Sequence, residues 1–196
     1  RPVPPALASA ISAACARTGA LLIADEVQSG SGRTGTFLYS GQAGLTPDLV
    51  ALGKALGGGV PVGAAMTSGR VAAAVSAGDH GTTYGGNLLA CRAALTFLDL
   101  LDSGLQESVG RMGAYLQNKL RALAASRPGA IAAVRGAGLI AGVELKADAA
   151  PVVAAALDKG LLVNRTATTV LRLLPPYIVS EGDIDRAVGI LDQVLA

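Results

Sequence analysis

Two short apolar runs decide the fold of this chain: Leu21-Leu22-Ile23-Ala24, followed at once by Asp25-Glu26-Val27-Gln28, and Leu49-Val50-Ala51-Leu52, followed by Gly53-Lys54. Continuous apolar runs of this length are typical of strands buried in a parallel sheet. The segment between them is longer than the roughly twelve residues that a crossover between parallel strands needs. The sequence therefore predicts an open α/β sheet with Asp25 and Lys54 at the carboxyl ends of its strands, where such sheets bind ligands.

The rest of the chain predicts further elements around these two strands. Helices are expected over 4–18, 88–101, 105–123 and 148–159, and a last helix should begin at Ser180, which with Asp183 resembles a capping box. Strands are expected over 20–24, 48–53, 60–67, 161–164 and 170–174, with a bent pair over 130–145. We therefore predict a C-terminal part of a large α/β domain over 1–105 and a small α+β domain over 106–196.

Composition excludes several classes of protein. The 196 residues have a formal net charge of +2 with scattered arginines, which argues against nucleic acid binding. No apolar run approaches the ~18 residues of a membrane-spanning helix. The isolated Cys15 and Cys91 fit small buried side chains in a reducing cytoplasm. With one histidine, His80, the chain offers no His-rich metal site. We therefore predict a cytoplasmic protein that binds no metal, membrane or nucleic acid.

The pair of Asp25 and Lys54 suits a pyridoxal phosphate enzyme. The amine of the lysine would form the Schiff base, and the carboxylate would pair with the pyridinium nitrogen. A Walker loop is excluded because the glycines Gly57-Gly58-Gly59 follow the lysine and Ala55 occupies the position that needs a hydroxyl. Taken singly, a solvated surface lysine and a solvated strand-end aspartate remain the ordinary alternatives.

An ordered set of motifs resembles the class III aminotransferases. The set comprises Asp25-Glu26-Val27-Gln28, Gly32-Arg33-Thr34-Gly35, Lys54 with Leu56-Gly57-Gly58-Gly59, and His80-Gly81-Thr82-Thr83-Tyr84-Gly85-Gly86-Asn87. Within the class, residues 136–139, 161–164 and 171–176 are most similar to the acetylornithine aminotransferases. The resemblance implies fold type I, the cofactor pyridoxal 5′-phosphate and amino transfer from N-acetylornithine to 2-oxoglutarate in arginine biosynthesis. Ornithine, succinylornithine and 4-aminobutyrate aminotransferases are the alternatives within the class.

The resemblance also assigns a role to individual residues. Lys54 matches the Schiff-base lysine and Asp25 the partner of the ring nitrogen. Val27 matches the residue that packs on the ring, Gln28 the contact to its 3-oxygen, and Glu26 completes this cofactor-binding motif. Thr83 matches the hydroxyl that reaches the cofactor phosphate of the neighbouring subunit. On the substrate side, Thr82 matches an adjacent hydroxyl, and Arg172 matches the arginine that receives a substrate carboxylate, a task that suits its forked guanidinium.

The resemblance further implies a homodimer with the active site at the subunit interface. The N-terminal portion of the family, with its phosphate-binding turn, stacking aromatic and second substrate arginine, has no counterpart in these 196 residues. The start at Arg1-Pro2, without an initiator methionine, predicts a start within a longer protein. We therefore expect little activity from the isolated chain. A non-catalytic fragment or a partner-dependent module is the alternative of another class.

Overall fold

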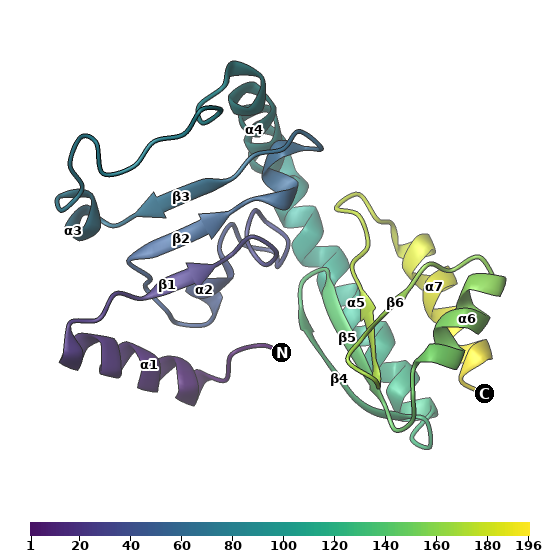
Figure 1. Ribbon diagram of the computed structural model, residues 1–196. Coiled ribbons are helices and arrows are strands. Elements are labelled where there is room, and N and C mark those ends of the chain that lie inside the picture. The colour runs from purple at the N-terminus through teal and green to yellow at the C-terminus, as the bar shows by residue number, and fades with distance from the viewer. The chain divides into compact units, whose positions relative to one another are not determined.

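The computed structural model describes residues 1–196 and divides into two compact units (Figure 1). The first, which we call the N-unit, comprises Val3–Gln106. The second, the C-unit, comprises Glu107–Ala196 together with Arg1–Pro2. No helix of either unit is long and apolar enough to cross a membrane.

The N-unit is built on a three-stranded sheet of order β1-β2-β3. Strand β1 (Ile23–Asp25) runs parallel to β2 (Leu49–Leu52), and β3 (Ala64–Thr67) runs antiparallel to β2. The first helix lies beside β1 in Figure 1 and ends at Gly19, whose φ of 71° needs a glycine. The helices of this unit are α1 (Pro5–Thr18), α2 (Tyr39–Gln42), the 3₁₀ turn η1 (Lys54–Gly57), α3 (Gly69–Ala72) and α4 (Leu88–Leu100).

Asp48 fixes the start of β2 beside the start of β1. Its Oδ2 accepts a hydrogen bond from the backbone N–H of Leu22 at 3.0 Å, and its Oδ1 lies 3.0 Å from the guanidinium of Arg70. The Leu22 hydrogen bond, and next to it the Arg70 charge, hold the pKa of the Asp48 carboxyl below its usual value. This anchor sets the register that places Asp25 opposite Ala51.

All three strands of the N-unit are shorter than the sequence predicts, and the difference at the start of the strand is largest for β1 and β3. The run over 20–24 gives a strand only at Ile23–Asp25, and the run over 60–67 gives one only at Ala64–Thr67. Pro61 accounts for the second difference, because proline has no N–H to donate to a neighbouring strand. The parallel pairing of the two strands that end in ionisable residues is confirmed.

The C-unit is a four-stranded antiparallel sheet, of order β4-β5-β7-β6, with helices against one face. Its strands are β4 (Ile131–Ala137), β5 (Ile140–Leu145), β6 (Asn164–Thr166) and β7 (Val170–Leu173). Its helices are α5 (Gln106–Ser126), α6 (Ala150–Asp158) and α7 (Glu181–Val194). Between α4 and α5 the segment η2 (Leu101–Leu105) is kinked at Gly104, as the sequence predicts.

One face of this sheet forms the core of the C-unit. Side chains alternate along β5 and β7, so that Val143 and Leu171 are fully buried while Gly142 and Arg172 lie on the opposite face. The buried side packs with apolar residues of α5 and α7: Val109, Leu116, Leu120, Leu123, Ile184 and Leu191. The capping box of Ser180 and Asp183 is present at the start of α7.

The prediction for β6 is wrong by three residues. The apolar run Leu161-Leu162-Val163 suggests a strand over 161–164, but the strand lies at Asn164–Thr166. Leu161 instead donates its N–H to the carbonyl of Ala156 and closes the end of α6, and the Leu162 side chain is 88% exposed. Pairing with β7, rather than local β-propensity, selects the strand.

A matched pair of glycines on α5 tests the packing of the C-unit. A Cβ on Gly113 would lie 2.5 Å from Gly138 Cα in the β4–β5 turn, whereas a Cβ on Gly110 would meet nothing within 4 Å. We expect Gly113→Ala to lower the free energy of unfolding by about 1 to 3 kcal/mol through overpacking. Gly110→Ala should raise it by about 0.5 to 1 kcal/mol through helix propensity. Urea denaturation followed by circular dichroism measures both, and equal stability of the two variants would contradict this packing.

Candidate active site

The structure brings Asp25 and Lys54 to neighbouring strand ends. Asp25 is the last residue of β1 and lies opposite Ala51 in the parallel register, while Lys54 follows β2 two residues beyond its end. The backbone N–H of Glu26 donates to the carbonyl of Ala51 at 2.9 Å and continues the pairing past Asp25. Both ionisable side chains therefore belong to the carboxyl edge of the parallel pair, where an open α/β sheet places its ligands.

Lys54 has an unusual backbone conformation. Its φ is 45°, in the left-handed region that side chains other than glycine rarely adopt, and it is one of three such residues in the chain. Conformations of this kind cost on the order of 1 to 3 kcal/mol and cluster at functional sites. The Lys54 side chain is exposed, and its amine makes no hydrogen bond or ion pair within the chain. The fold therefore places a lysine just beyond the end of β2 and leaves its amine without a partner within the chain.

The Asp25 carboxylate is fixed by its own turn. Its Oδ1 accepts a hydrogen bond from the backbone N–H of Val27 at 3.0 Å, and its second oxygen makes no hydrogen bond within the chain. The side chain is exposed, as is that of Gln28. Asp25 thus presents an oriented carboxylate with one oxygen available to a partner outside the chain.

Val27 lies beside the residue that precedes the lysine. A Cβ on Gly53 would be 3.4 Å from Val27 Cγ1 and 3.8 Å from Cγ2, an ordinary van der Waals separation. The branched side chain of Val27 therefore packs over Gly53. A rigid apolar surface next to the strand ends suits one face of a flat ring.

Glu26 is the buried member of this group. It is 2% exposed, and its carboxylate accepts hydrogen bonds from Ser29 Oγ at 2.7 Å, from the N–H of Tyr39 at 3.1 Å and from the N–H of Ser40 at 2.5 Å. Both oxygens are thus used to hold the loop that follows β1. Burial of a carboxylate requires such compensation, and here the chain's own residues supply it.

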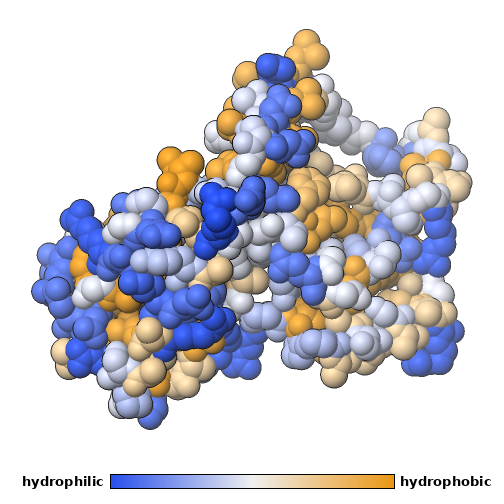
Figure 2. Space-filling view, turned by 180° about the vertical axis from the view of Figure 1, so that it is seen from behind, coloured by the Kyte–Doolittle hydropathy of each residue, from blue (hydrophilic) through white to orange (hydrophobic).

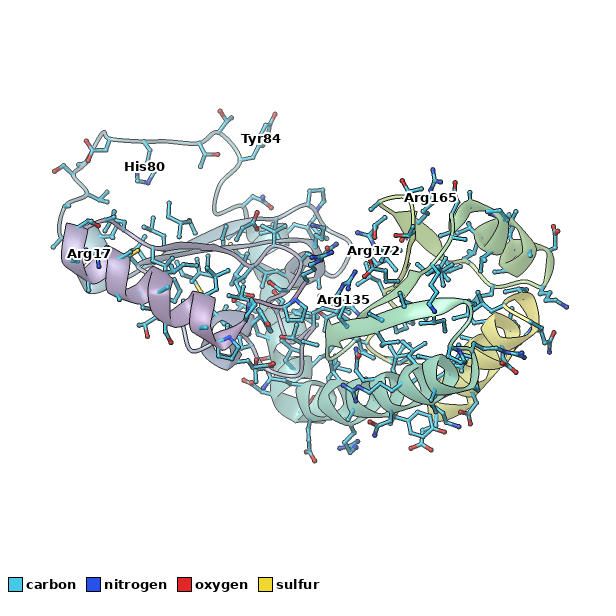
Figure 3. The ribbon with its side chains drawn as sticks, turned by 90° about the horizontal axis from the view of Figure 1, so that it is seen from below. Arg17, His80, Tyr84, Arg135, Arg165 and Arg172 are labelled. Atoms are coloured by element: carbon cyan, nitrogen blue, oxygen red, sulfur yellow. The ribbon has the colours of Figure 1, made fainter.

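Thr82 and Thr83 lie on a separate part of the N-unit. They belong to the exposed loop between α3 and α4. Figure 3 shows the neighbouring His80 and Tyr84 on this loop, which extends away from the sheet. Thr82 Oγ1 accepts a hydrogen bond from the N–H of Gly85, and no hydrogen bond links either threonine to Asp25 or Lys54. Within this chain the two threonines are therefore not brought to the strand-end residues.

Arg172 belongs to the C-unit, on β7. It lies on the face of the sheet opposite the core, and its Nε donates a hydrogen bond to Asn164 Oδ1 of β6 at 3.1 Å. Sequence reasoning did not find Asn164, because the predicted strand over 161–164 gave no register with β7. In neither unit are three His, Cys, Asp or Glu side chains placed to hold a metal ion.

Comparison with known proteins identifies the family. The chain is 44% identical to the acetylornithine aminotransferase of Aquifex aeolicus over 92% of its own length and 46% of that protein. Among solved structures, it is 31% identical to the acetylornithine aminotransferase of Elizabethkingia anophelis, with a TM-score of 0.88 over 98% of this chain and 49% of that one. It is 32% identical, with a TM-score of 0.88, to the ornithine aminotransferase of Toxoplasma gondii, whose active site is partly occupied by pyridoxal phosphate; that match covers 97% of this chain and 46% of the other.

The chain spans about half the length of the curated relatives it matches. Its α/β fold is that of the pyridoxal-phosphate-dependent aminotransferases. The model of the family "Aminotransferase class-III" matches residues 1–195. This chain therefore belongs to the class III aminotransferases, a family that depends on pyridoxal phosphate.

Proposed function

We propose that this chain supplies the lysine-bearing part of an aminotransferase active site and acts in the transfer of an amino group from N-acetylornithine to 2-oxoglutarate. The observation that supports this most directly is the placement of Asp25 and Lys54 at the carboxyl ends of two parallel strands, with Lys54 in a left-handed conformation. Strain at a residue with an unengaged amine favours a chemical role over a solvated surface lysine.

The residues present fit pyridoxal phosphate. Asp25 has an oriented carboxylate with an available oxygen, Val27 an apolar face beside Gly53, and Lys54 an amine without a partner. Pyridoxal phosphate has a protonated ring nitrogen that a carboxylate can pair with, a ring face that an apolar side chain can pack against, and an aldehyde carbon that an amine can bond to. In this proposal Gln28 contacts the ring's 3-oxygen, and Glu26 contributes by holding the loop after β1.

The cofactor, when bound, supplies an electron-withdrawing ring that stabilises negative charge at the substrate α-carbon. Asp25 keeps a proton on the ring nitrogen, because its negative charge stabilises the positive charge there. Once substrate has taken its place on the cofactor, the Lys54 amine would act as a general base on the proton of the substrate α-carbon and then as a general acid that delivers it across the substrate nitrogen to the former aldehyde carbon. Arg172 binds a substrate carboxylate through its guanidinium fork.

Sequence similarity supports N-acetylornithine as the amino donor. The curated relatives at 42 to 45% identity are acetylornithine aminotransferases. Structural similarity does not separate the donors, since ornithine aminotransferases at 29 to 32% identity match with TM-scores of 0.86 to 0.89. We give more weight to the sequence comparison, because one backbone fold serves several substrates in this class. The same similarity supports a role in arginine biosynthesis.

We further propose a cytoplasmic homodimer in which Thr83 contacts the cofactor phosphate of the neighbouring subunit and Thr82 lies on the substrate side. Support comes from the exposure of the loop that bears both threonines. Large hydrophobic side chains near it, including Tyr84, Leu88 and Leu89 at 81%, 88% and 69% exposure, offer surface for a subunit contact. Figure 2 shows hydrophobic residues at the surface of both units.

A comparison of amino donors tests this function. An enzyme of the relatives' length that carries these residues should transfer the amino group of N-acetylornithine to 2-oxoglutarate with a higher kcat/KM than that of ornithine, succinylornithine or 4-aminobutyrate. Steady-state rates with each donor measure the order. A preference for another donor would show that N-acetylornithine is the wrong substrate. The absence of transfer from every donor would favour the non-catalytic alternative.

The 196-residue chain by itself provides the internal control. We expect it to show negligible transfer at saturating cofactor, because a misplacement of the reacting groups by ~1 Å can cost about 10²-fold in rate. Turnover comparable to that of the longer enzyme would overturn the proposal that the active site needs groups beyond these residues.

A further inference from the structure

The face of the C-unit sheet opposite its core carries a row of partly exposed residues in cross-strand register. Arg135 of β4 lies opposite Gly142 of β5, Gly142 lies opposite Arg172 of β7, and Arg172 lies opposite Asn164 of β6. Figure 3 shows Arg135 and Arg172 close to each other, with Arg165 apart from them. Gly142 has no side chain, and a Cβ at this position would lie 3.5 Å from Val170 Cγ1 and 4.0 Å from Arg135 Cγ, so no side chain of β5 stands between the two arginines at this point.

The two arginines of this row differ in charge compensation. Arg135 forms an ion pair with Glu144, which lies two residues from Gly142 on the same face of β5. Arg172 has no carboxylate within ion-pair distance, and its partner is the neutral amide of Asn164. A carboxylate that approaches the row therefore meets an uncompensated positive charge at Arg172, beside a pair whose charges cancel.

Asn164 engages Nε of Arg172, the guanidinium nitrogen that an end-on bidentate contact with a carboxylate does not use. Its Oδ1 accepts from Arg172 Nε, so that the two terminal nitrogens remain available. A free arginine side chain has about 2 kcal/mol of rotamer entropy, which binding a ligand would have to overcome. A hydrogen bond already made at Nε removes part of that freedom in advance.

We propose that Asn164 is a positioning residue for Arg172: it orients the guanidinium for a substrate carboxylate while leaving its charge intact. This inference rests on the proposed function, in which Arg172 receives that carboxylate. The neutrality of the partner is essential to it. An aspartate at this position would accept the same hydrogen bond, but it would form an ion pair with Arg172 and compete with the substrate.

Two substitutions separate the hydrogen bond from the charge. Asn164→Leu keeps the branching at Cγ, with a somewhat larger side chain, and removes the acceptor. Asn164→Asp keeps the acceptor and adds a negative charge. In the holoenzyme, Asn164→Leu should raise the KM for 2-oxoglutarate by about tenfold, the effect of losing one hydrogen bond to a charged group. Asn164→Asp should raise it by a similar factor or more, because its charge competes with the substrate for Arg172, and kcat should change less than about twofold in both variants. Thr166→Val, two residues along β6 on the same face, is the matched control and should leave KM unchanged.

A readout independent of turnover accompanies the kinetics. Glutarate, a dicarboxylate without a reactive keto or amino group, should bind the holoenzyme about tenfold more weakly in both Asn164 variants by calorimetry. A purely structural role for Asn164 predicts the opposite result for Asn164→Asp, which keeps the cross-strand hydrogen bond and should then resemble the parent enzyme. Near-normal KM and glutarate affinity in Asn164→Asp would overturn the inference.

Arg172→Leu distinguishes failure of this inference from failure of the function on which it rests. If Arg172→Leu raises the KM for 2-oxoglutarate and neither Asn164 variant does, Arg172 binds the carboxylate without the help of Asn164, and only the inference is wrong. If Arg172→Leu leaves both KM and glutarate affinity unchanged, the proposed role of Arg172 itself is wrong.

Discussion

Replacing Lys54 by alanine is expected to abolish nearly all amino transfer. No other lysine of the chain stands at the end of a parallel strand beside an oriented carboxylate, since Lys119 pairs with Asp185 at 2.7 Å on the surface of the C-unit. Alanine removes the amine that would both hold the cofactor and move the proton at the α-carbon. The loss should appear in kcat measured at saturating cofactor and both substrates.

The fold should survive this substitution, because Lys54 is exposed and its amine makes no contact within the chain. Circular dichroism and thermal denaturation of cofactor-free Lys54→Ala should therefore match those of the cofactor-free parent. Lys159→Ala, another exposed lysine, serves as the control and should retain full activity. Borohydride reduction of the parent holoenzyme followed by peptide mapping locates the modified lysine, and label on Lys119, Lys146 or Lys159 in place of Lys54 would disprove the assignment.

The sequence was sufficient to predict the placement of the strand-end residues. Apolar runs that end in Asp25 and Lys54 imply parallel strands, and parallel strands bring their carboxyl ends to one edge of a sheet. That inference needs no knowledge of tertiary contacts, because a run's length and its terminal residue are local properties. The observed parallel pairing agrees with it.

The conformation of Lys54 could not have been predicted in the same way. Its left-handed φ follows from the chain's turn out of β2 into η1, and a lysine at position 54 does not indicate such a conformation. The hydrogen-bond partners of the Glu26 carboxylate could not have been predicted either. Its motif suggests a cofactor-binding residue, but the contacts of its buried carboxylate with Tyr39 and Ser40 involve backbone groups thirteen or more positions away.

The partner of Arg172 was missed because strand register is a property of two strands. The run Leu161-Leu162-Val163 has the stronger local preference for a strand, yet the pairing with β7 begins at Asn164. A shift of this kind changes which side chains share a face. The position opposite Arg172 could therefore be identified only once β6 and β7 were seen together.

Asp25→Asn is expected to reduce turnover far more than cofactor affinity. Asparagine keeps the shape of the side chain, and its Oδ1 can still accept from the N–H of Val27, the hydrogen bond that orients Asp25. The change removes the negative charge that would hold a proton on the ring nitrogen. Without that proton the ring withdraws electrons less strongly from the α-carbon, so the loss falls on the transition state.

We expect kcat of Asp25→Asn to fall on the order of 10² to 10⁴-fold, with cofactor affinity changed by less than about tenfold. Asp79→Asn is the matched control, since Asp79 is also exposed and also accepts a backbone N–H, that of Ser76 at 2.7 Å. It should keep full turnover. Single-turnover rates with each substrate separate the chemical step from binding. If Asp25→Asn turned over at nearly the parent rate, the carboxylate would serve only to shape the turn at Val27. A parallel loss of affinity and rate would instead mean that Asp25 contributes mainly to holding the cofactor in place.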